Sequence, residues 1–185
     1  ESVDFGDATA MILDIGGGSN EFIICDREQT LWKHSFELGM ARILELFDLS
    51  DPINVEEVSA LEDFFREGLR PLYEAVIRER PAILVGASGS FDTFFSLIRE
   101  SGVDLPPGEH GRELPLEEYH KLHSRLLLST LEERKRMPGM EPVRVEMIVP
   151  ASIFVSFILR EFGIRILLQS DFALKEGVIS ELLGL

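Results

Sequence analysis

The chain contains the stretch Ile12-Leu13-Asp14-Ile15-Gly16-Gly17-Gly18-Ser19-Asn20-Glu21-Phe22-Ile23-Ile24, in which three glycines join two apolar, strand-like segments. Consecutive glycines lose much backbone entropy on folding, so they are expected where the backbone needs unusual dihedral angles or close approach. A hairpin of this composition leaves N–H groups around a concavity that suits a phosphate. The flanking acids, Asp14 and Glu21, suit a divalent cation or a positioned water. The stretch therefore predicts a phosphate site; a glycine-rich hairpin with two incidental acids is the alternative.

Four blocks of sequence follow one another in a recognisable order. They are Asp14-Ile15-Gly16-Gly17-Gly18-Ser19-Asn20-Glu21, Phe36-Glu37-Leu38-Gly39-Met40-Ala41-Arg42, Val85-Gly86-Ala87-Ser88-Gly89-Ser90 and Ser170-Asp171-Phe172-Ala173-Leu174-Lys175-Glu176-Gly177-Val178. Together they resemble the exopolyphosphatase and guanosine pentaphosphate phosphohydrolase (Ppx/GppA) family, the first block being highly specific. The resemblance implies an α/β fold, one lobe of the actin-like fold of acetate kinase, hsp70 and actin, with an RNase H-like mixed sheet flanked by helices. We expect residues 1–185 to form a single domain.

The first block carries most of the implied site. By resemblance, Asp14 binds or positions Mg²⁺, and Glu21 orients the attacking water or holds the metal. The alternatives are an Asp14 that caps the turn and a Glu21 that faces solvent from a strand. Donors to phosphate oxygens are expected from the backbone and hydroxyl groups of Gly16, Gly17, Gly18 and Ser19.

The third block lies between a buried strand and a helix, where the N–H groups of a helix N-terminus can bind an anion. Its predicted phosphate-binding residues are Gly86, Ser88, Gly89 and Ser90. The chain departs from the family here, because Asp92 follows in the first helical turn, where it caps the helix but repels a phosphate. Arg42, in the second block, either forms a salt bridge to the glycine loop or faces phosphate, and the sequence does not choose.

The family's function implies a hydrolase that releases the terminal phosphate of inorganic polyphosphate or guanosine pentaphosphate. In that family an N-terminal lobe with the general base precedes the first strand, and this chain begins at Glu1 with no counterpart. We therefore expect the C-terminal lobe of a two-lobed enzyme, a possible homodimer, that is inactive alone. The alternatives are a non-catalytic polyphosphate or guanosine-phosphate binding module or dimer scaffold and, more weakly, an actin-like sugar kinase or ATPase. Because no Walker lysine follows the glycines, a P-loop NTPase is excluded.

The charge is strongly acidic, with a formal net charge of −15 that lies almost wholly in the first 111 residues. Such a surface argues against duplex nucleic acid as a partner. A polyphosphate track would need the one visible basic cluster, Arg134-Lys135-Arg136 with Arg125 and Arg144, although solvated helix-end charges are the preferred interpretation. No apolar stretch approaches ~20 residues, so no membrane span is expected. The single cysteine, Cys25, fits a buried position and a reducing, cytoplasmic setting.

Hydrophobic periodicity predicts the secondary structure. Strands are expected at 11–15, 21–26, 30–37, 82–85 and 166–169, and an irregular segment at 101–115. Helices are expected at 38–47, 54–80 with a kink or break at Pro71, 90–99, 116–131, within the apolar stretch 147–162 after Pro150, and 173–183. His120 and His123 share a helix face, and a surface pair is preferred over a metal site because no third ligand is in register.

Overall fold

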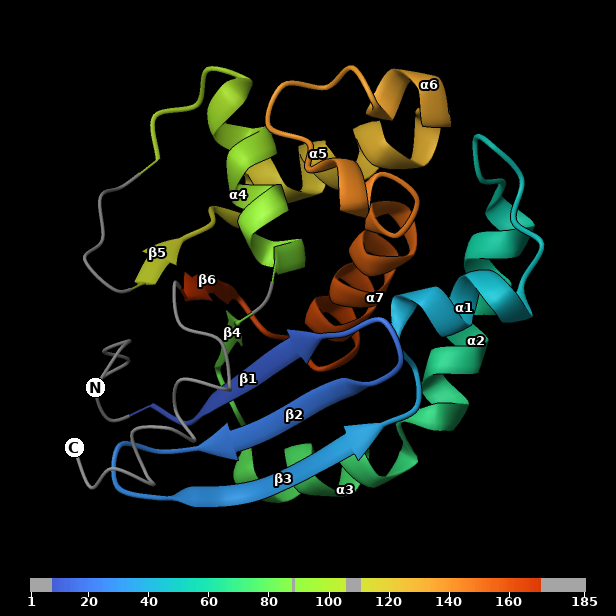
Figure 1. The fold of residues 1–185 in the computed structure, drawn as a ribbon. Helices are drawn as coiled ribbons and strands as arrows, with labels where there is room; N and C mark the ends of the chain where they lie inside the picture. The colour runs from blue at the N-terminus through green and yellow to red at the C-terminus, as the bar shows by residue number, and fades with distance from the viewer. Residues whose placement is uncertain (1–7, 88, 106–110, 171–185) are drawn as a thin grey trace.

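A six-stranded mixed sheet forms the centre of the protein, with strand order β3-β2-β1-β4-β6-β5 (Figure 1). The structure, a computed structural model, describes residues 8–87, 89–105 and 111–170. The strands are β1 (Ala10–Ile15), β2 (Asn20–Cys25), β3 (Thr30–Phe36), β4 (Ile83–Gly86), β5 (Gly111–Glu113) and β6 (Ile166–Ser170). The expected strands are therefore confirmed, and β5 is an addition inside the segment predicted to be irregular.

The directions of the strands bring distant loops together. Strands β1, β4 and β6 run parallel to one another, while β2 and β3 extend the sheet as an antiparallel meander and β5 pairs antiparallel with β6. Leu13 pairs with Gly86, and the N–H of Ala87 donates to the Leu13 carbonyl at 2.9 Å. Because parallel neighbours end at the same edge of a sheet, the segments that follow β1 and β4 start side by side.

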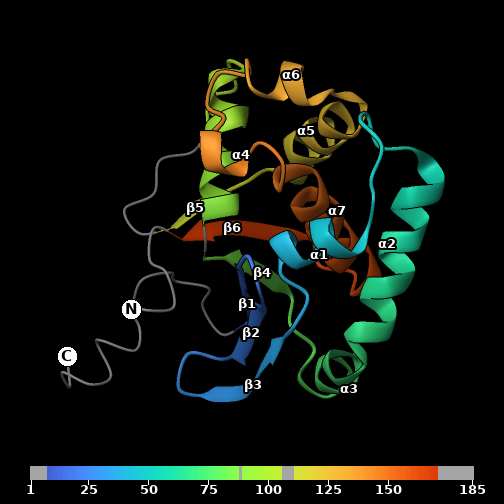
Figure 2. The same ribbon diagram turned by 45° about the vertical axis from the view of Figure 1, so that its right-hand side comes forward.

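The helices follow the predicted pattern with shifted ends. They are α1 (Met40–Leu46), α2 (Val55–Gly68), α3 (Arg70–Glu79), α4 (Gly89–Glu100), α5 (Leu116–Leu128), α6 (Leu131–Arg134) and α7 (Ile148–Glu161), with a 3₁₀ turn at Pro142–Arg144. Figure 2 shows α1, α2, α3 and α7 on the same side of strands β1–β3. Within the described ranges, none of the helices combines the length and apolar character that crossing a bilayer needs.

Local capping explains where several helices begin and end. Asn54 starts α2 with a capping box to Glu57, and the chain breaks at Leu69 so that Pro71 enters the first turn of α3, where a proline is tolerated. The helix expected at 116–131 ends at Leu128, because Thr130 forms a second capping box with Glu133 and starts α6. The helix expected at 173–183 lies outside the described residues.

The core is divided unequally between the two faces of the sheet. Met11, Leu13 and Ile15 alternate along β1 toward a large cluster that includes most of α7 and the phenylalanines of α4. Ala10 and Ile12 point the other way, into a small cluster with Ile83, Val85 and Leu168. Since side chains alternate along a strand, Asp14 lies on the face of this small cluster.

Candidate functional site

The glycine stretch forms a tight turn at the end of β1. The N–H of Gly16 donates to the carbonyl of Ser19 at 3.0 Å, and a Cβ on Gly16 would lie 2.5 Å from that oxygen. Gly16 is thus needed for the turn itself. The prediction that its N–H binds phosphate is wrong, because that donor is already bonded within the turn.

Helix α1 begins directly behind this turn (Figures 1 and 2). The carbonyl of Gly16 accepts from the N–H of Met40 at 2.9 Å, that of Gly17 from Ala41 at 3.0 Å, and that of Gly18 from Gly39 at 3.2 Å. A helix leaves its first N–H groups without partners in the helix, and here the turn supplies the acceptors.

This arrangement fixes the direction of the loop's donors. In a trans peptide the N–H points opposite to the C=O of the same plane. With three successive carbonyls bonded at α1, the N–H groups of Gly17, Gly18 and Ser19 point away from the helix. None of these three donors has an acceptor among the described residues. The turn therefore presents three successive outward donors, one fewer than predicted, and successive N–H groups of a turn can bind an anion.

Gly39 and Asn20 hold the turn against α1. A Cβ on Gly39 would lie 2.3 Å from the carbonyl oxygen of Gly17, so only glycine permits this approach. The fully buried Asn20, the first residue of β2, donates from Nδ2 to the Leu38 carbonyl at 2.7 Å. Leu38 and Gly39, in the second block of the sequence, thus hold the glycine turn of the first block against α1.

The two predicted acids lie opposite each other on neighbouring strands. Asp14 pairs with Glu21 in the β1–β2 register, so both side chains emerge on the same face of the sheet. Oε1 of Glu21 accepts hydrogen bonds from Ser19 Oγ at 2.5 Å and from Ser35 Oγ at 2.8 Å. Glu21 is partly buried and oriented by two hydroxyls, rather than a solvent-facing strand residue. Its Oε2 has no hydrogen bond within the described part of the chain.

The Asp14 and Glu21 carboxylates suit Mg²⁺ as part of a larger ligand set. Within the described ranges, no group of three or more His, Cys, Asp or Glu side chains could hold a metal by itself. Mg²⁺ is commonly held by one or two carboxylates together with substrate phosphates and waters. The Asp14 and Glu21 pair is the one- or two-carboxylate arrangement that such an ion uses.

The second glycine-containing loop differs from the prediction. Gly86 is buried within β4, and a Cβ there would lie 2.0 Å from the Phe91 ring, so this glycine serves packing. Ser90 is 1% exposed, which prevents its side chain from contacting a ligand. Gly89 is the first residue of α4, and Ser88 lies outside the described residues. Asp92 accepts a hydrogen bond from Gln169 Nε2 at 2.6 Å. Of the described residues in this loop, the backbone N–H groups of Gly89 and Ser90, at the start of α4, remain candidates.

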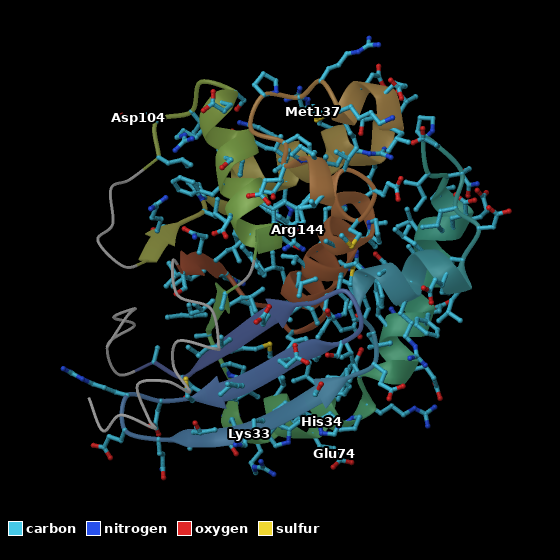
Figure 3. All side chains as sticks on the ribbon, in the orientation of Figure 1. Lys33, His34, Glu74, Asp104, Met137 and Arg144 are labelled. Atoms are coloured by element: carbon cyan, nitrogen blue, oxygen red, sulfur yellow. The ribbon has the colours of Figure 1, made fainter. Side chains whose placement is uncertain are left out.

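Arg144 is a site residue that the sequence did not assign. A Cβ on Gly89 would lie 2.5 Å from Arg144 Nη2 and 3.3 Å from its Nε, so the guanidinium rests against the start of α4. Figure 3 shows Arg144 between α4 and α7. Its Nε is buried and has no hydrogen-bond partner within the described ranges of the chain. A cation beside the positive end of a helix is electrostatically unfavourable unless an anion binds between them. Its place in the basic cluster was a signal that the sequence offered.

Two other arginines prove to be structural. Arg42, for which the sequence left two roles open, pairs with Glu37 at 3.2 Å on the surface. Arg134 is 7% exposed and pairs with Asp51 at 3.0 Å, so the interpretation of this residue as a solvated helix-end charge is wrong. The sequence could not reveal the partner, because Asp51 lies far away along the chain.

His123 and Cys25 take no part in the site. His123 Nδ1 lies 3.2 Å from Ser152 Oγ, and burial lowers the pKa of its imidazole to about 4, so the ring is neutral at physiological pH. Cys25 is partly rather than fully buried, and burial raises the pKa of its thiol, which disfavours the reactive thiolate. The predicted surface pair is correct for His120, which is exposed, but wrong for His123, which is partly buried against α7. Cys25 lacks the environment of a nucleophile.

Comparison with known proteins agrees with this geometry. The sequence model of the Ppx/GppA phosphatase family matches residues 2–185, and the chain belongs to that family. The chain is 28% identical over 181 residues to exopolyphosphatase 2 of Mycobacterium tuberculosis, covering 96% of this chain and 56% of that protein. It therefore spans little more than half the length of this curated relative.

Solved structures give the same result for the fold. An exopolyphosphatase from Cytophaga hutchinsonii superimposes with a TM-score of 0.90 at 33% identity, covering 100% of this chain and 60% of the other. The Ppx/GppA enzyme of Aquifex aeolicus gives a TM-score of 0.78 at 25% identity, covering 95% and 57%. The sheet and its helices are thus one lobe of the actin-like ATPase fold, as the sequence predicted.

Proposed function

We propose that the full-length protein hydrolyses the terminal phosphoanhydride bond of inorganic polyphosphate. The observation that carries the proposal is the turn at Gly17, Gly18 and Ser19, whose three N–H groups point together away from α1. The carboxylates of Asp14 and Glu21 and the guanidinium of Arg144 lie near the same edge of the sheet. The relatives named exopolyphosphatases support the reaction class.

Each group has a distinct task in this proposal. The N–H groups of the turn and the Arg144 guanidinium donate charge-assisted hydrogen bonds to the phosphate oxygens, and the structure holds these donors in fixed positions. Oε2 of Glu21, left open while Oε1 is held by two serines, orients the attacking water. Asp14 holds Mg²⁺, which when bound neutralises charge on the phosphate oxygens.

The remaining part of the catalytic site is proposed to come from a preceding lobe. The chain covers 56% of its curated relative, so a large part of a protein of that length would lie outside it. We therefore propose that this chain alone is inactive because the general base belongs to the other lobe. Processive release of phosphate by residues 1–185 alone would contradict this part of the proposal.

The decisive test is Glu21→Gln in the full-length protein, with phosphate release from magnesium polyphosphate as the readout. The substitution keeps the shape of the side chain and removes its charge, so activity should fall about a hundredfold or more. Glu28→Gln, the same change at the exposed β2–β3 turn, is the matched control and should retain full activity.

Each outcome has a different meaning. If both variants match the wild type, polyphosphate hydrolysis stands and the assignment of Glu21 is wrong. If the wild-type protein releases no phosphate but binds polyphosphate, the non-catalytic binding module replaces the enzyme.

A second candidate substrate, guanosine pentaphosphate, is favoured by a cavity beside the turn. The cavity has a volume of about 710 Å³, and its walls come from α1, α6 and residues 140–147. Its lining is mostly apolar and includes Ala41, whose N–H binds the glycine turn, and the carboxylate residue Glu146. An apolar cavity with one carboxylate suits a guanine base, whose ring N–H groups donate to an acid.

Substrate competition separates the two candidates. If the base occupies this cavity, Glu146→Gln should raise the KM for guanosine pentaphosphate about tenfold, by loss of a charge-assisted hydrogen bond. The same variant should hydrolyse polyphosphate normally. Equal effects on both substrates would remove the cavity from substrate recognition.

A further inference from the structure

We infer that the ion pair between Asp51 and Arg134 positions Arg144 for phosphate binding. The inference rests on the proposed function, because it concerns the guanidinium assigned there to the substrate. Neither member of the pair is a site residue in the proposal above. Both would act through the segment that carries Arg144.

Arg134 uses all three of its guanidinium nitrogens in separate contacts. Nη2 binds Asp51 Oδ1 at 3.0 Å, Nη1 donates to the Ser129 carbonyl at 2.5 Å, and Nε donates to the Val145 carbonyl at 3.1 Å. Arg134 is 7% exposed, so its bonds to the two carbonyls are buried, while the bond to Asp51, whose side chain is 41% exposed, is partly buried. The side chain thus joins the two ends of segment 129–145, which contains α6 and the 3₁₀ turn.

Asp51 anchors this segment to a different part of the chain. It lies in the connection between α1 and α2, and besides Arg134 it accepts from the N–H of Leu131, at 2.7 Å to Oδ2 and 3.0 Å to Oδ1. That N–H is at the first residue of α6, where a carboxylate is favoured by the helix dipole. One carboxylate therefore fixes both the start of α6 and the guanidinium that spans it.

The contact at Val145 reaches the site directly. Val145 follows Arg144 in the chain and is 6% exposed, so its backbone is enclosed as well as bonded. Arg144 in turn places its guanidinium against Gly89 at the start of α4. Its Nε has no hydrogen-bond partner among the described residues, and the bond from Arg134 Nε to the next carbonyl, that of Val145, restrains the backbone at the base of this side chain. Small displacements of a binding group have large effects on rate.

The test is a double-mutant cycle in the full-length protein with inorganic tripolyphosphate as the probe. Asp51→Asn should raise the KM about tenfold and leave kcat within about twofold, as expected for a displaced binding group. Arg144→Gln should give a similar or larger rise. In the double variant, Asp51→Asn should add less than about twofold to the effect of Arg144→Gln, because its effect passes through that side chain. Additive effects would overturn the inference.

A matched control separates positioning from stability. Arg160 and Glu62 form another long-range ion pair, at 2.6 Å between α7 and α2, with no bond to the Arg144 segment. Glu62→Gln should leave the KM unchanged even where its Tm falls. If Glu62→Gln raises the KM as much as Asp51→Asn does, the Asp51 effect is one of general stability and the inference fails.

Two further measurements keep the inference testable. If Asp51→Asn does not fold, Arg134→Lys replaces it in the cycle, since one ammonium group cannot bond all three acceptors. If tripolyphosphate is not hydrolysed, its binding is measured by calorimetry in the same variants and must show the same coupling. A wild-type response from Arg144→Gln would refute the proposed role of Arg144. A loss in Arg144→Gln without one in Asp51→Asn would refute only the positioning inference.

Discussion

The turn at 16–19 and the loop at 86–90 contain similar residues in similar places, yet their glycines have different structural roles. Both follow parallel strands that are neighbours in the sheet. In the first, the glycines let three carbonyls meet α1 and leave three N–H groups directed outward. In the second, Gly86 makes room for the Phe91 ring and Gly89 for the Arg144 guanidinium. A glycine-rich motif therefore does not identify a phosphate loop until the backbone donors have been traced.

The largest expected effect comes from Gly39→Ala. The new methyl would lie 2.3 Å from the Gly17 carbonyl oxygen, so α1 must move away from the turn. We expect a loss of at least about 3 kcal/mol in the free energy of unfolding and about a hundredfold in phosphate release. Denaturant unfolding and a phosphate assay on the full-length protein measure both.

Gly68→Ala is the control for that variant. Its methyl meets the flexible Leu38 side chain at 3.0 Å instead of a backbone, and it stands in a helix where alanine is preferred. It should be nearly neutral. Comparable losses in the two variants would show that α1 does not hold the turn in place.

Gly86→Ala should affect stability and spare function. The added methyl overlaps the Phe91 ring at 2.0 Å, and such overpacking costs about 1–3 kcal/mol in the free energy of unfolding. The KM for polyphosphate should stay within about twofold of wild type, because Gly86 is a packing residue. A large rise in KM at unchanged stability would restore Gly86 as a ligand residue and weaken the contrast between the loops.

Gly89→Ala should have the opposite effect to Gly86→Ala: it should spare stability and weaken substrate binding. Its methyl would meet only the end of the Arg144 side chain, which can swing away, so the free energy of unfolding should change by less than about 1 kcal/mol. Displacing the guanidinium should raise the KM about tenfold by weakening one charge-assisted hydrogen bond. An unchanged KM, confirmed in parallel with Arg144→Gln, would mean that Arg144 does not bind the substrate from this position.

Gly18→Ala should give the smallest effect. A Cβ there meets nothing within 4 Å, so stability should stay within about 0.5 kcal/mol of wild type. The methyl would stand beside the outward N–H groups and should weaken polyphosphate binding about threefold, the loss of part of one hydrogen bond. Full binding affinity in this variant would argue that phosphate does not approach this side of the turn.

Much of the fold follows from local sequence. Alternation of apolar residues predicts β1 to β3, and Asn54 with Glu57 marks the start of α2. Strand β5 escaped prediction because Gly111, Arg112 and Glu113 have no apolar pattern and become a strand only by pairing with β6. The helix at 116–131 was predicted too long because the capping box at Thr130 lies inside an amphipathic run.

The part of the site whose residues lie close together in the sequence was predictable. Asp14 and Glu21 are placed opposite each other by the hairpin alone, since residues flanking a short turn pair across it. Arg144 was not predictable as a site residue, because its proximity to Gly89 depends on how α4 and α7 pack. The burial of the Ser90 side chain was not predictable either, because a helix start does not reveal which of its side chains is buried.

The sequence by itself therefore determined the family, the described strands other than β5, the glycine turn and the pairing of its two acids, because each depends on residues close together in the chain. Only the tertiary structure decided which N–H groups of the turn remain open. It also decided that Gly86 serves packing, that Arg134 is buried against Asp51 and that Arg144 lies at the start of α4. Those outcomes depend on contacts between segments far apart in the chain. A local pattern of side chains does not show which of these segments come into contact.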